Sequence, residues 1–312
     1  NVVIASTVNV NNNNNACNNI NITSAGILRK HSASHYTLTV NGNFTNEGTV
    51  TNNVGYTFNL NVIGNVTNNG TMTNNALTLS GSGDQQLAST QPLAISNFTK
   101  NQTSGRAIAT TGLNFVGTNI TLGSDTLEFT TGNFLTISGG YLSTGVIYKS
   151  SLPALQITSG NGTYAFSLTI DAFQSELYGD LRIYGNSNVF KKNVINFGTL
   201  QNSQASNYTL SVNGNFTNNG TVKNNVINFT VNVSGNLTNN GTWTSYSAVL
   251  NGTGNQLLAM TQPFSGSNFS KTVSAGRVIA TTGLNFVGTS IDLNLDTLEF
   301  STGNTISING GF

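Results

Sequence analysis

One phrase of the sequence occurs four times and limits what this chain can fold into. It first occupies positions 37–53, TLTVNGNFTNEGTVTNN, and returns at 59–75; a second pair occupies positions 209–225 and 230–246. Four apolar positions recur in every copy: Leu38, Val40, Phe44 and Val50; Leu60, Val62, Val66 and Met72; Leu210, Val212, Phe216 and Val222; Val231, Val233, Leu237 and Trp243. A phrase this short cannot bury its apolar side chains alone, so the copies must stack as core columns.

Each phrase has the pattern of three short strands separated by two corners. Leu38 and Val40 alternate with threonines, which is the period of a strand with one buried face. Asn41-Gly42 marks the following corner, and the next corner ends at Gly48. Three strands in each repeat of the phrase predict an all-β fold, a three-faced parallel β-solenoid in which each strand pairs with its counterpart one turn later.

The low charge excludes several other classes of protein. Only 7% of the residues are charged, the net charge is +1, and asparagine outnumbers even the 34 glycines. Such a chain gives no electrostatic reason to expect a nucleic-acid partner. No apolar run approaches the length of a membrane span. The 37% of apolar residues also argues against disorder.

The chain is a tandem duplication. The segment ATTGLNFVGT at 109–118 recurs at 280–289, and the phrases upstream recur at a similar offset. We therefore expect one solenoid copy in residues 1–140, connecting solenoid turns in residues 141–172, and a second copy in residues 173–312. Strands are predicted in and after the connector at 141–148, 154–157, 164–170 and 180–184. No segment with the composition of a linker separates the two copies, so we expect one continuous rod.

The opening pattern of the chain carries a resemblance. Apolar residues and asparagines follow one another through VVI at 2–4, TVNV at 7–10, ACNNINI at 16–22, GIL at 26–28 and YTLTVNGNFTN at 36–46. This pattern resembles the repeats of large secreted surface proteins of Bacteroidota, which are similar to adhesins and extracellular filaments exported by type IX secretion. The resemblance implies an extracellular or cell-surface location and a structural or adhesive role. It brings no catalytic residues with it.

Residues that could support catalysis are sparse. Asp125 with Glu128 is the one recurring acidic pair, and it returns as Asp296 with Glu299. An odd separation along a strand places the two side chains on opposite faces, so they are not expected to converge on a substrate or a cation. We therefore predict no enzymatic activity, no cofactor and no metal site.

Five further residues have two interpretations each. His31 and His35 share a corner with no Cys, Asp or Glu nearby in the sequence, which disfavours a metal site. Cys17 fits a small buried apolar residue better than a nucleophile, because no basic partner is evident. Arg106 and Arg277 are expected to pair with acidic residues of adjacent turns, the alternative being full solvation.

The asparagines predict a structural device. They tolerate the left-handed backbone of corners. Where one corner recurs in every turn, their side-chain amides can form a hydrogen-bonded ladder along the solenoid. Asp-Thr-Leu triplets at 125–127 and 296–298 resemble an O-glycosylation motif of the same bacterial group, which makes Thr126 and Thr297 candidate modification sites.

The recurring features add length to the fold and none of them adds a site. We therefore expect a structural subunit or stalk of an extracellular filament or cell-surface adhesin. The alternative is a carbohydrate-binding or carbohydrate-active β-helix, similar to tailspike modules, with surface glycans as partners. Its sugar-stacking residues would be tyrosines of the connector region, provided that they line one exposed face: Tyr141, Tyr148, Tyr164, Tyr178 and Tyr184.

The two ends of the sequence suggest self-assembly. The chain begins within a strand pattern around Val3 and stops at Phe312, the counterpart of Tyr141. A solenoid end without a cap exposes unpaired backbone groups and apolar interior. We therefore expect the ends at Val3 and Phe312 to be covered by other copies of the chain, in an end-to-end or overlapping homopolymer, or by continuation of a longer chain.

Overall fold

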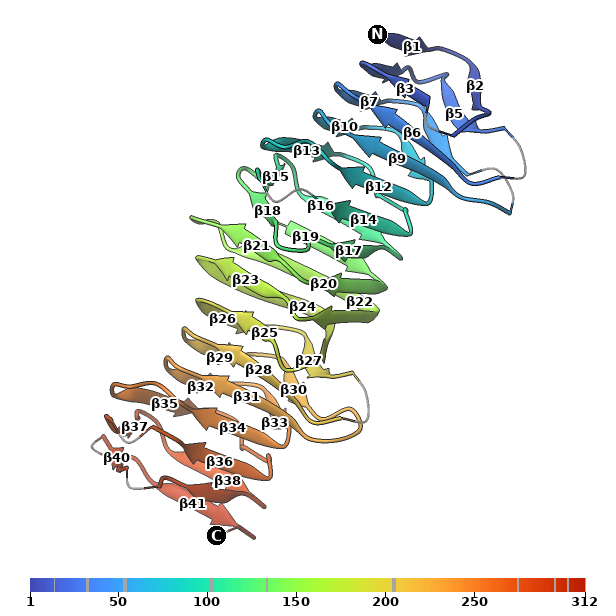
Figure 1. Ribbon diagram of the computed structural model, residues 1–312. Helices are drawn as coiled ribbons and strands as arrows, with labels where there is room; N and C mark the ends of the chain where they lie inside the picture. The colour runs from blue at the N-terminus through green and yellow to red at the C-terminus, as the bar shows by residue number, and fades with distance from the viewer. Residues whose placement is uncertain are drawn as a thin grey trace. The chain divides into compact units, whose positions relative to one another are not determined.

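The computed structural model describes residues 1–13, 15–31, 34–52, 55–101, 104–132, 134–203, 206–273, 275–294, 296–301 and 303–311. Within these ranges every regular element is a β-strand and none is a helix. Each strand pairs in parallel with a strand of the next turn, so the predicted β-solenoid is confirmed (Figure 1). The chain divides into two compact units, Asn1–Ser150 and Ser151–Phe312.

The first unit contains short strands of three to five residues. They are β1 (Val2–Ile4), β2 (Thr7–Val10), β3 (Asn15–Cys17), β4 (Ile20–Ile22), β5 (Ile27–Lys30), β6 (Tyr36–Val40), β7 (Phe44–Asn46), β8 (Thr49–Thr51), β9 (Phe58–Val62), β10 (Val66–Asn68), β11 (Thr71–Thr73), β12 (Ala76–Leu79), β13 (Gln85–Ser89), β14 (Asn97–Lys100), β15 (Ala107–Ala109), β16 (Leu113–Val116), β17 (Asn119–Thr121), β18 (Thr126–Phe129), β19 (Phe134–Ser138), β20 (Gly140–Ser143) and β21 (Val146–Lys149).

These strands form three faces. One face runs β1-β4-β7-β10-β13-β15-β18-β21, and a second runs β3-β6-β9-β12-β14-β17-β20. The third runs β2-β5-β8-β11, continues through single bridges at Leu93, and ends in β16-β19. Phe44 pairs with Val66 and Val66 with Leu87, so successive turns have nearly the same length and the strands stay in register.

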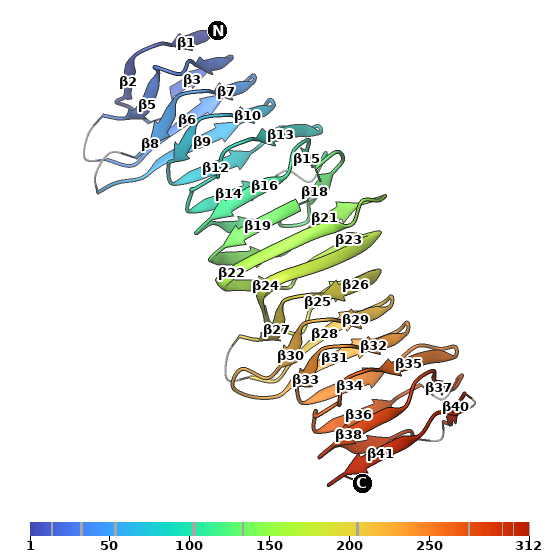
Figure 2. The ribbon, with the colours of Figure 1, turned by 180° about the vertical axis from the view of Figure 1, so that it is seen from behind.

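The second unit follows the same plan after two longer strands (Figure 2). Its strands are β22 (Leu155–Phe166), β23 (Thr169–Ala172), β24 (Gln174–Tyr184), β25 (Asn188–Phe190), β26 (Asn193–Asn196), β27 (Thr199–Asn202), β28 (Tyr208–Val212), β29 (Phe216–Asn218), β30 (Thr221–Lys223), β31 (Phe229–Val233), β32 (Leu237–Asn239), β33 (Thr242–Thr244), β34 (Ser247–Leu250), β35 (Gln256–Met260), β36 (Asn268–Lys271), β37 (Val278–Ala280), β38 (Leu284–Val287), β39 (Ser290–Asp292), β40 (Leu298–Phe300) and β41 (Ile306–Asn309).

The strand bounds predicted for the connector are wrong in two places. The segment predicted at 141–148 is two strands, β20 and β21. The segments predicted at 154–157 and 164–170 are joined in β22, which runs unbroken through residues 155–166, and the second is interrupted before β23 begins at Thr169. A register irregularity lies within this strand, between Ser159 and Thr163. β24 likewise spans two faces, pairing with β26 before Gly179 and with β27 after it. Gly179 has a φ of 75°, and a Cβ there would lie 1.9 Å from the carbonyl oxygen of Ser159, so only glycine fits this bend.

The recurring apolar positions lie in the interior. All sixteen are buried, and they pair directly in adjacent turns: Leu38 with Leu60, Val40 with Val62, Phe44 with Val66, Val50 with Met72, Leu210 with Val231, Val212 with Val233, Phe216 with Leu237, and Val222 with Trp243. The column beyond Trp243 continues through bridges to Phe264 and Phe286. Ring centroids of Trp243 and Phe264 are 5.3 Å apart. Adjacent turns are therefore joined by both backbone pairing and side-chain stacking.

Candidate functional site

The predicted amide ladder is present inside both units. In the first unit, Nδ2 of Asn46 donates to Oδ1 of Asn68 (2.7 Å), and Nδ2 of Asn68 donates to Oγ of Ser89 (3.0 Å). Both asparagines are fully buried. Because Oδ1 of Asn46 accepts the N–H of Gly48 (3.1 Å), the backbone fixes which amide atom points to the next turn.

The second unit repeats this arrangement at the same place in the phrase. Nδ2 of Asn196 donates to Oδ1 of Asn218 (2.9 Å), and Nδ2 of Asn218 donates to Oδ1 of Asn239 (2.8 Å). All three residues are fully buried. Asn218 is therefore bonded to its counterparts in the turns before and after it, which is the condition for burying an amide without loss of stability, whereas Oδ1 of Asn196 accepts no hydrogen bond from the described residues.

Four lysines are buried, which the sequence reasoning missed. Lys30, Lys100, Lys149 and Lys271 each end a strand and are at most 2% exposed. The signal was the strand alternation, since each lysine stands two residues after a buried residue on the same side of its strand. A buried ammonium group requires compensating partners, and those lie in other turns.

Two kinds of partner surround these lysines. Nζ of Lys30 lies 4.4 Å from the ring centroid of Tyr56, a cation–π contact. Nζ of Lys149 donates to the carbonyl oxygens of Thr130 (3.5 Å) and Gly132 (3.4 Å). Lys100 and Lys271 occupy equivalent corners of the two copies and also face carboxylates and amides.

The two exposed arginines pair with acidic residues of adjacent turns, so that prediction is confirmed. Nη2 of Arg106 lies 2.8 Å from Oδ2 of Asp84, and the same guanidinium contacts Glu128. Nη1 of Arg277 lies 2.7 Å from Oε2 of Glu299. Hydrogen bonds from Arg106 hold the pKa of Asp84 below its ordinary value.

The recurring acidic pairs do not form a shared site. Asp125 is buried before β18, whereas Glu128 lies on the outer side of that strand against Arg106. Asp296 faces the buried Lys271, and Glu299 faces Arg277. Each carboxylate is thus committed to a different cation.

The other residues singled out in the sequence are scattered. Nδ1 of His35 lies 2.6 Å from Oγ1 of Thr57, and His31 is exposed. Among the described residues no three His, Cys, Asp or Glu side chains are placed to hold a metal ion. The prediction that Cys17 is buried is wrong: it is only half-buried, because β3 presents it near the surface, with Sγ 3.9 Å from the carbonyl oxygen of Thr39. Partial burial raises the pKa of its thiol.

The predicted modification and assembly residues differ in accessibility. Thr126 begins β18 and is half-buried, whereas Thr297 precedes β40 and is exposed. Val3 is 67% exposed. Phe312 lies outside the described residues.

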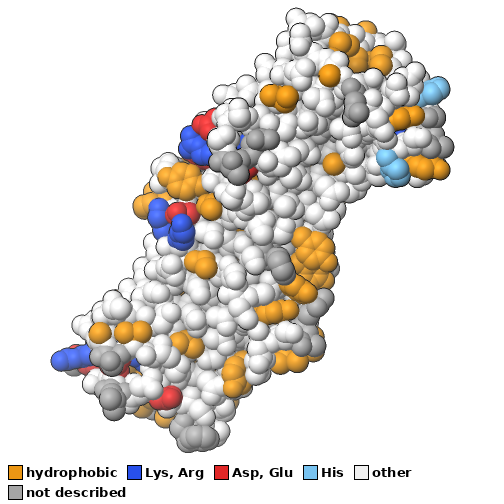
Figure 3. Space-filling model, in the orientation of Figure 1, with side chains coloured by type: hydrophobic (Ala, Val, Ile, Leu, Met, Phe, Trp, Pro, Cys, Tyr) orange, Lys and Arg blue, Asp and Glu red, His pale blue; other side chains and the backbone are white. Residues whose placement is uncertain are grey.

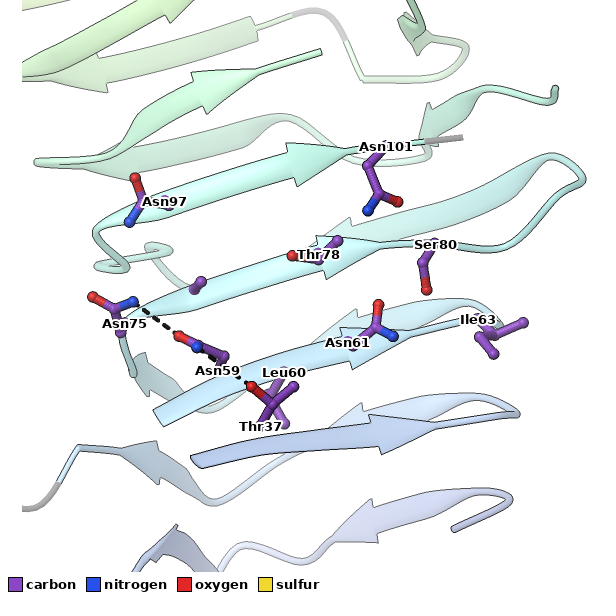
Figure 4. A pocket seen from close by; sticks show the side chains of 11 residues that line it. Thr37, Asn59, Leu60, Asn61, Ile63, Asn75, Thr78, Ser80, Asn97 and Asn101 are labelled. Atoms are coloured by element: carbon purple, nitrogen blue, oxygen red, sulfur yellow. Dashed lines mark hydrogen bonds between the residues drawn. The ribbon is translucent and has the colours of Figure 1, made fainter. Parts of the chain in front are cut away.

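An asparagine-lined groove lies on the second face of the first unit (Figure 4). It crosses β6, β9, β12 and β14 and has a volume of about 750 Å³. Oδ1 of Asn59 accepts a hydrogen bond from Asn75 (2.8 Å), while Asn61 and Ser80 each present a buried oxygen without a partner among the described residues. The lining is uncharged, so it suits a neutral polar ligand or water better than an ion.

The tyrosine face is the most chemically varied surface of the second unit. We define it as the outward-facing residues of β22 and β24 on both sides of the bend at Gly179: Gln156, Tyr164, Gln174, Glu176, Tyr178, Asp180, Arg182 and Tyr184. Oε2 of Glu176 accepts hydrogen bonds from Tyr178 (3.0 Å) and Gln156 (3.4 Å). Arg182 donates through Nε to Oδ2 of Asp180 (3.0 Å).

Aromatic rings extend this face toward the next turn. Tyr178 stacks on Phe197 with centroids 5.1 Å apart and an interplanar angle of 10°. Tyr184 packs against Tyr208 at 5.5 Å. In the first unit, Tyr141 and Tyr148 lie on two different faces, in β20 and β21. In the second unit, Tyr178 precedes the bend at Gly179 and lies on the face of β26, whereas Tyr164 and Tyr184 lie beyond it on the face of β27, so the five tyrosines do not line one face.

Charge is rare on the surface as well. In the view of Figure 3 most of the surface is backbone and uncharged polar side chains, with acidic and basic groups gathered in small clusters. The described part of the chain contains no helix long and apolar enough to cross a membrane. Comparisons with protein-family models, curated proteins and solved structures find no match to this chain.

Proposed function

We propose that this chain is a structural β-solenoid segment of an extracellular filament or cell-surface adhesin. The observation that carries the proposal is the amide ladder through Asn196, Asn218 and Asn239. The phrase that recurs in the sequence places the same buried amide at the same position in each turn. Its recurring residues thus connect one turn to the next, which is what a length-building element requires.

A whole-turn deletion tests this structural role. Removing residues 216–236 joins Asn215 to Leu237, the residue that pairs with Phe216, and so keeps the strands in register. We expect the shortened chain to keep its β-rich circular dichroism spectrum and cooperative unfolding. Removing residues 216–225 is the control, because it takes out only part of a turn and should abolish folding. Equal damage from both deletions would refute the proposal.

Self-assembly is a separate part of this proposal. The exposed Val3 would contact a second copy end to end. Electron microscopy and sedimentation of the purified chain should show filaments, and Val3→Asp should shorten or abolish them. A chain that sediments as a monomer at micromolar concentration would disprove assembly without affecting the whole-turn test.

A second candidate function is glycan binding at the tyrosine face. Its support is the combination of stacked rings at Tyr178 and Phe197 with carboxylate and amide groups around Glu176. Aromatic faces contact the apolar side of sugars, and carboxylates and amides accept or donate hydrogen bonds to their hydroxyls. A panel of soluble polysaccharides should bind the unaltered chain and lose affinity with Tyr178→Ala. Tyr141→Ala, in the other unit, is the matched control and should bind normally.

A further inference from the structure

Two equivalent corners each bury a lysine beside a glutamine and an aspartate. In the first unit they are Lys100, Gln85 and Asp125, which are 1%, 2% and 6% exposed. In the second unit the same positions hold Lys271, Gln256 and Asp296. The duplication has therefore kept a nucleophile, a carboxamide and a carboxylate together in a solvent-free place.

The lysine of the first corner reaches the glutamine directly. Nζ of Lys100 lies 3.3 Å from Oε1 of Gln85 and 2.8 Å from the carbonyl oxygen of Gly81. Burial lowers the pKa of Lys100, which favours the uncharged amine, while Asp125 acts in the opposite direction. An uncharged lysine amine is a nucleophile.

The glutamine is held in place by hydrogen bonds at both ends of its carboxamide. Its Oε1 accepts the backbone N–H of Gly81 (2.8 Å), so a donor already points at the oxygen that would become negatively charged. Its Nε2 donates to the carbonyl oxygens of Val62 (3.0 Å) and Gly64 (2.7 Å). The carboxamide therefore cannot rotate away from the lysine.

The second corner holds the equivalent residues, with Gln256 and Lys271 both bonded to Gly252, and it adds the position of the carboxylate. Oε1 of Gln256 accepts the N–H of Gly252 (3.0 Å), and Nζ of Lys271 donates to the carbonyl oxygen of Gly252 (2.5 Å). Oδ2 of Asp296 is 3.9 Å from that Nζ and accepts no hydrogen bond from the described residues. It is free to take a proton from the lysine.

We propose that each corner closes an intramolecular isopeptide bond, Lys100 to Gln85 and Lys271 to Gln256. The aspartate takes one proton from the ammonium group, and Nζ forms a bond to Cδ of the glutamine. The oxyanion is held by the backbone N–H, the Cδ–Nε2 bond breaks, and a second lysine proton leaves on the departing nitrogen as ammonia. The third stays on the new amide. No oxidant is needed, and the buried ion pair becomes a neutral amide and a neutral carboxyl group.

Intact-mass measurement of the unaltered full chain is decisive. We expect a mass lower than that of the sequence by two molecules of ammonia, and fragment spectra that join the peptide containing Lys100 to the one containing Gln85. Lys100→Met and Lys271→Met should each restore one ammonia, and Asp125→Asn should slow bond formation. Lys149→Met is the matched control: it removes an equally buried lysine that reaches backbone carbonyls at Thr130 and Gly132, and it should leave the deficit unchanged.

The opposite results would overturn the proposal. If the unaltered chain keeps the full mass of its sequence after prolonged warming at alkaline pH, the lysines serve only as hydrogen-bonding groups at the corners. A deficit that persists in the Lys100→Met, Lys271→Met double variant would assign the loss to other residues. Both outcomes are read from the mass alone, so neither depends on how stable the variants are.

Discussion

Replacement of Asn218 by alanine should destabilise the second unit strongly. Its side chain is fully buried and takes part in four hydrogen bonds. Nδ2 donates to Oδ1 of Asn239 (2.8 Å) and to the carbonyl oxygen of Thr242 (3.0 Å). Oδ1 accepts from Nδ2 of Asn196 (2.9 Å) and from the N–H of Gly220 (3.2 Å).

The expected loss follows from those four bonds. Each contributes about 1 kcal/mol net, and a buried group left without a partner costs about 1–3 kcal/mol. Asn196 keeps two acceptors, the carbonyl oxygens of Gly198 and Thr221, so its amide is not stranded. Oδ1 of Asn239 and the N–H of Gly220 do lose this partner. We expect Asn218→Ala to lower the free energy of unfolding by about 3–4 kcal/mol.

Urea unfolding followed by circular dichroism measures this loss. Asn219→Ala is the matched control, because it removes the adjacent asparagine, which is exposed and accepts one hydrogen bond from Asn240 (3.0 Å). The control should cost less than about 1 kcal/mol. If the two variants unfold within experimental error of each other, the buried ladder does not stabilise the solenoid as reasoned.

Three further outcomes are expected. Val62→Asp places an unpaired charge in a fully buried column and should yield insoluble or locally unfolded protein, assayed by limited proteolysis; native-like resistance would contradict the packing. Trp243→Ala removes a fully buried ring that packs against Phe264, and it should lower the free energy of unfolding in urea by about 3–5 kcal/mol. A loss below about 1 kcal/mol would mean that the neighbouring side chains fill the space left by the ring without a loss of stability. Because Arg106 lowers the pKa of Asp84, their pairing stabilises the fold above the ordinary carboxyl pKa, and this contribution disappears as the pH falls through the lowered value. Acid titration should show this loss of stability in the unaltered chain but not in Arg106→Met or at high salt. Identical titrations of the unaltered chain and Arg106→Met would argue against the pairing.

The repeat predicted the strand registers because periodic apolar positions leave little freedom. A slip of one residue between Leu38 and Leu60 would turn every buried side chain outward, so the spacing of the repeat determines the pairing. The buried amide ladder was predicted for a similar reason. An asparagine recurring at one place in the phrase meets its counterpart wherever the strands pair in register.

The buried lysines and the long strands could not be predicted in this way. A lysine is expected at the surface because removing an ammonium group from water is costly, and what makes Lys100 tolerable is the carbonyl oxygen of Gly81 on another turn. The sequence predicted two strands, at 154–157 and 164–170, yet β22 continues from one to the other with an irregularity between Ser159 and Thr163. In both cases the deciding contact comes from a turn that the local sequence does not contain.

The tyrosine face could be predicted only in part. The sequence indicated which tyrosines to compare, but their grouping depends on which strand follows each corner. The bend at Gly179 places Tyr178 and Tyr184 of the long β24 on different faces, and Tyr141 and Tyr148 also fall on different faces.

The amide ladder also has a direction. Every amide nitrogen in it donates toward the C-terminal turn, from Asn46 to Asn68 and from Asn196 through Asn218 to Asn239. Backbone N–H groups at Gly48 and Gly220 hold the oxygens of Asn46 and Asn218 in place, so these two amides cannot reverse. The aligned amide dipoles make the interior polar along its axis. Two such solenoids can continue one ladder only head to tail, since an inverted contact would set oxygen against oxygen, and a filament built this way would have two chemically different ends.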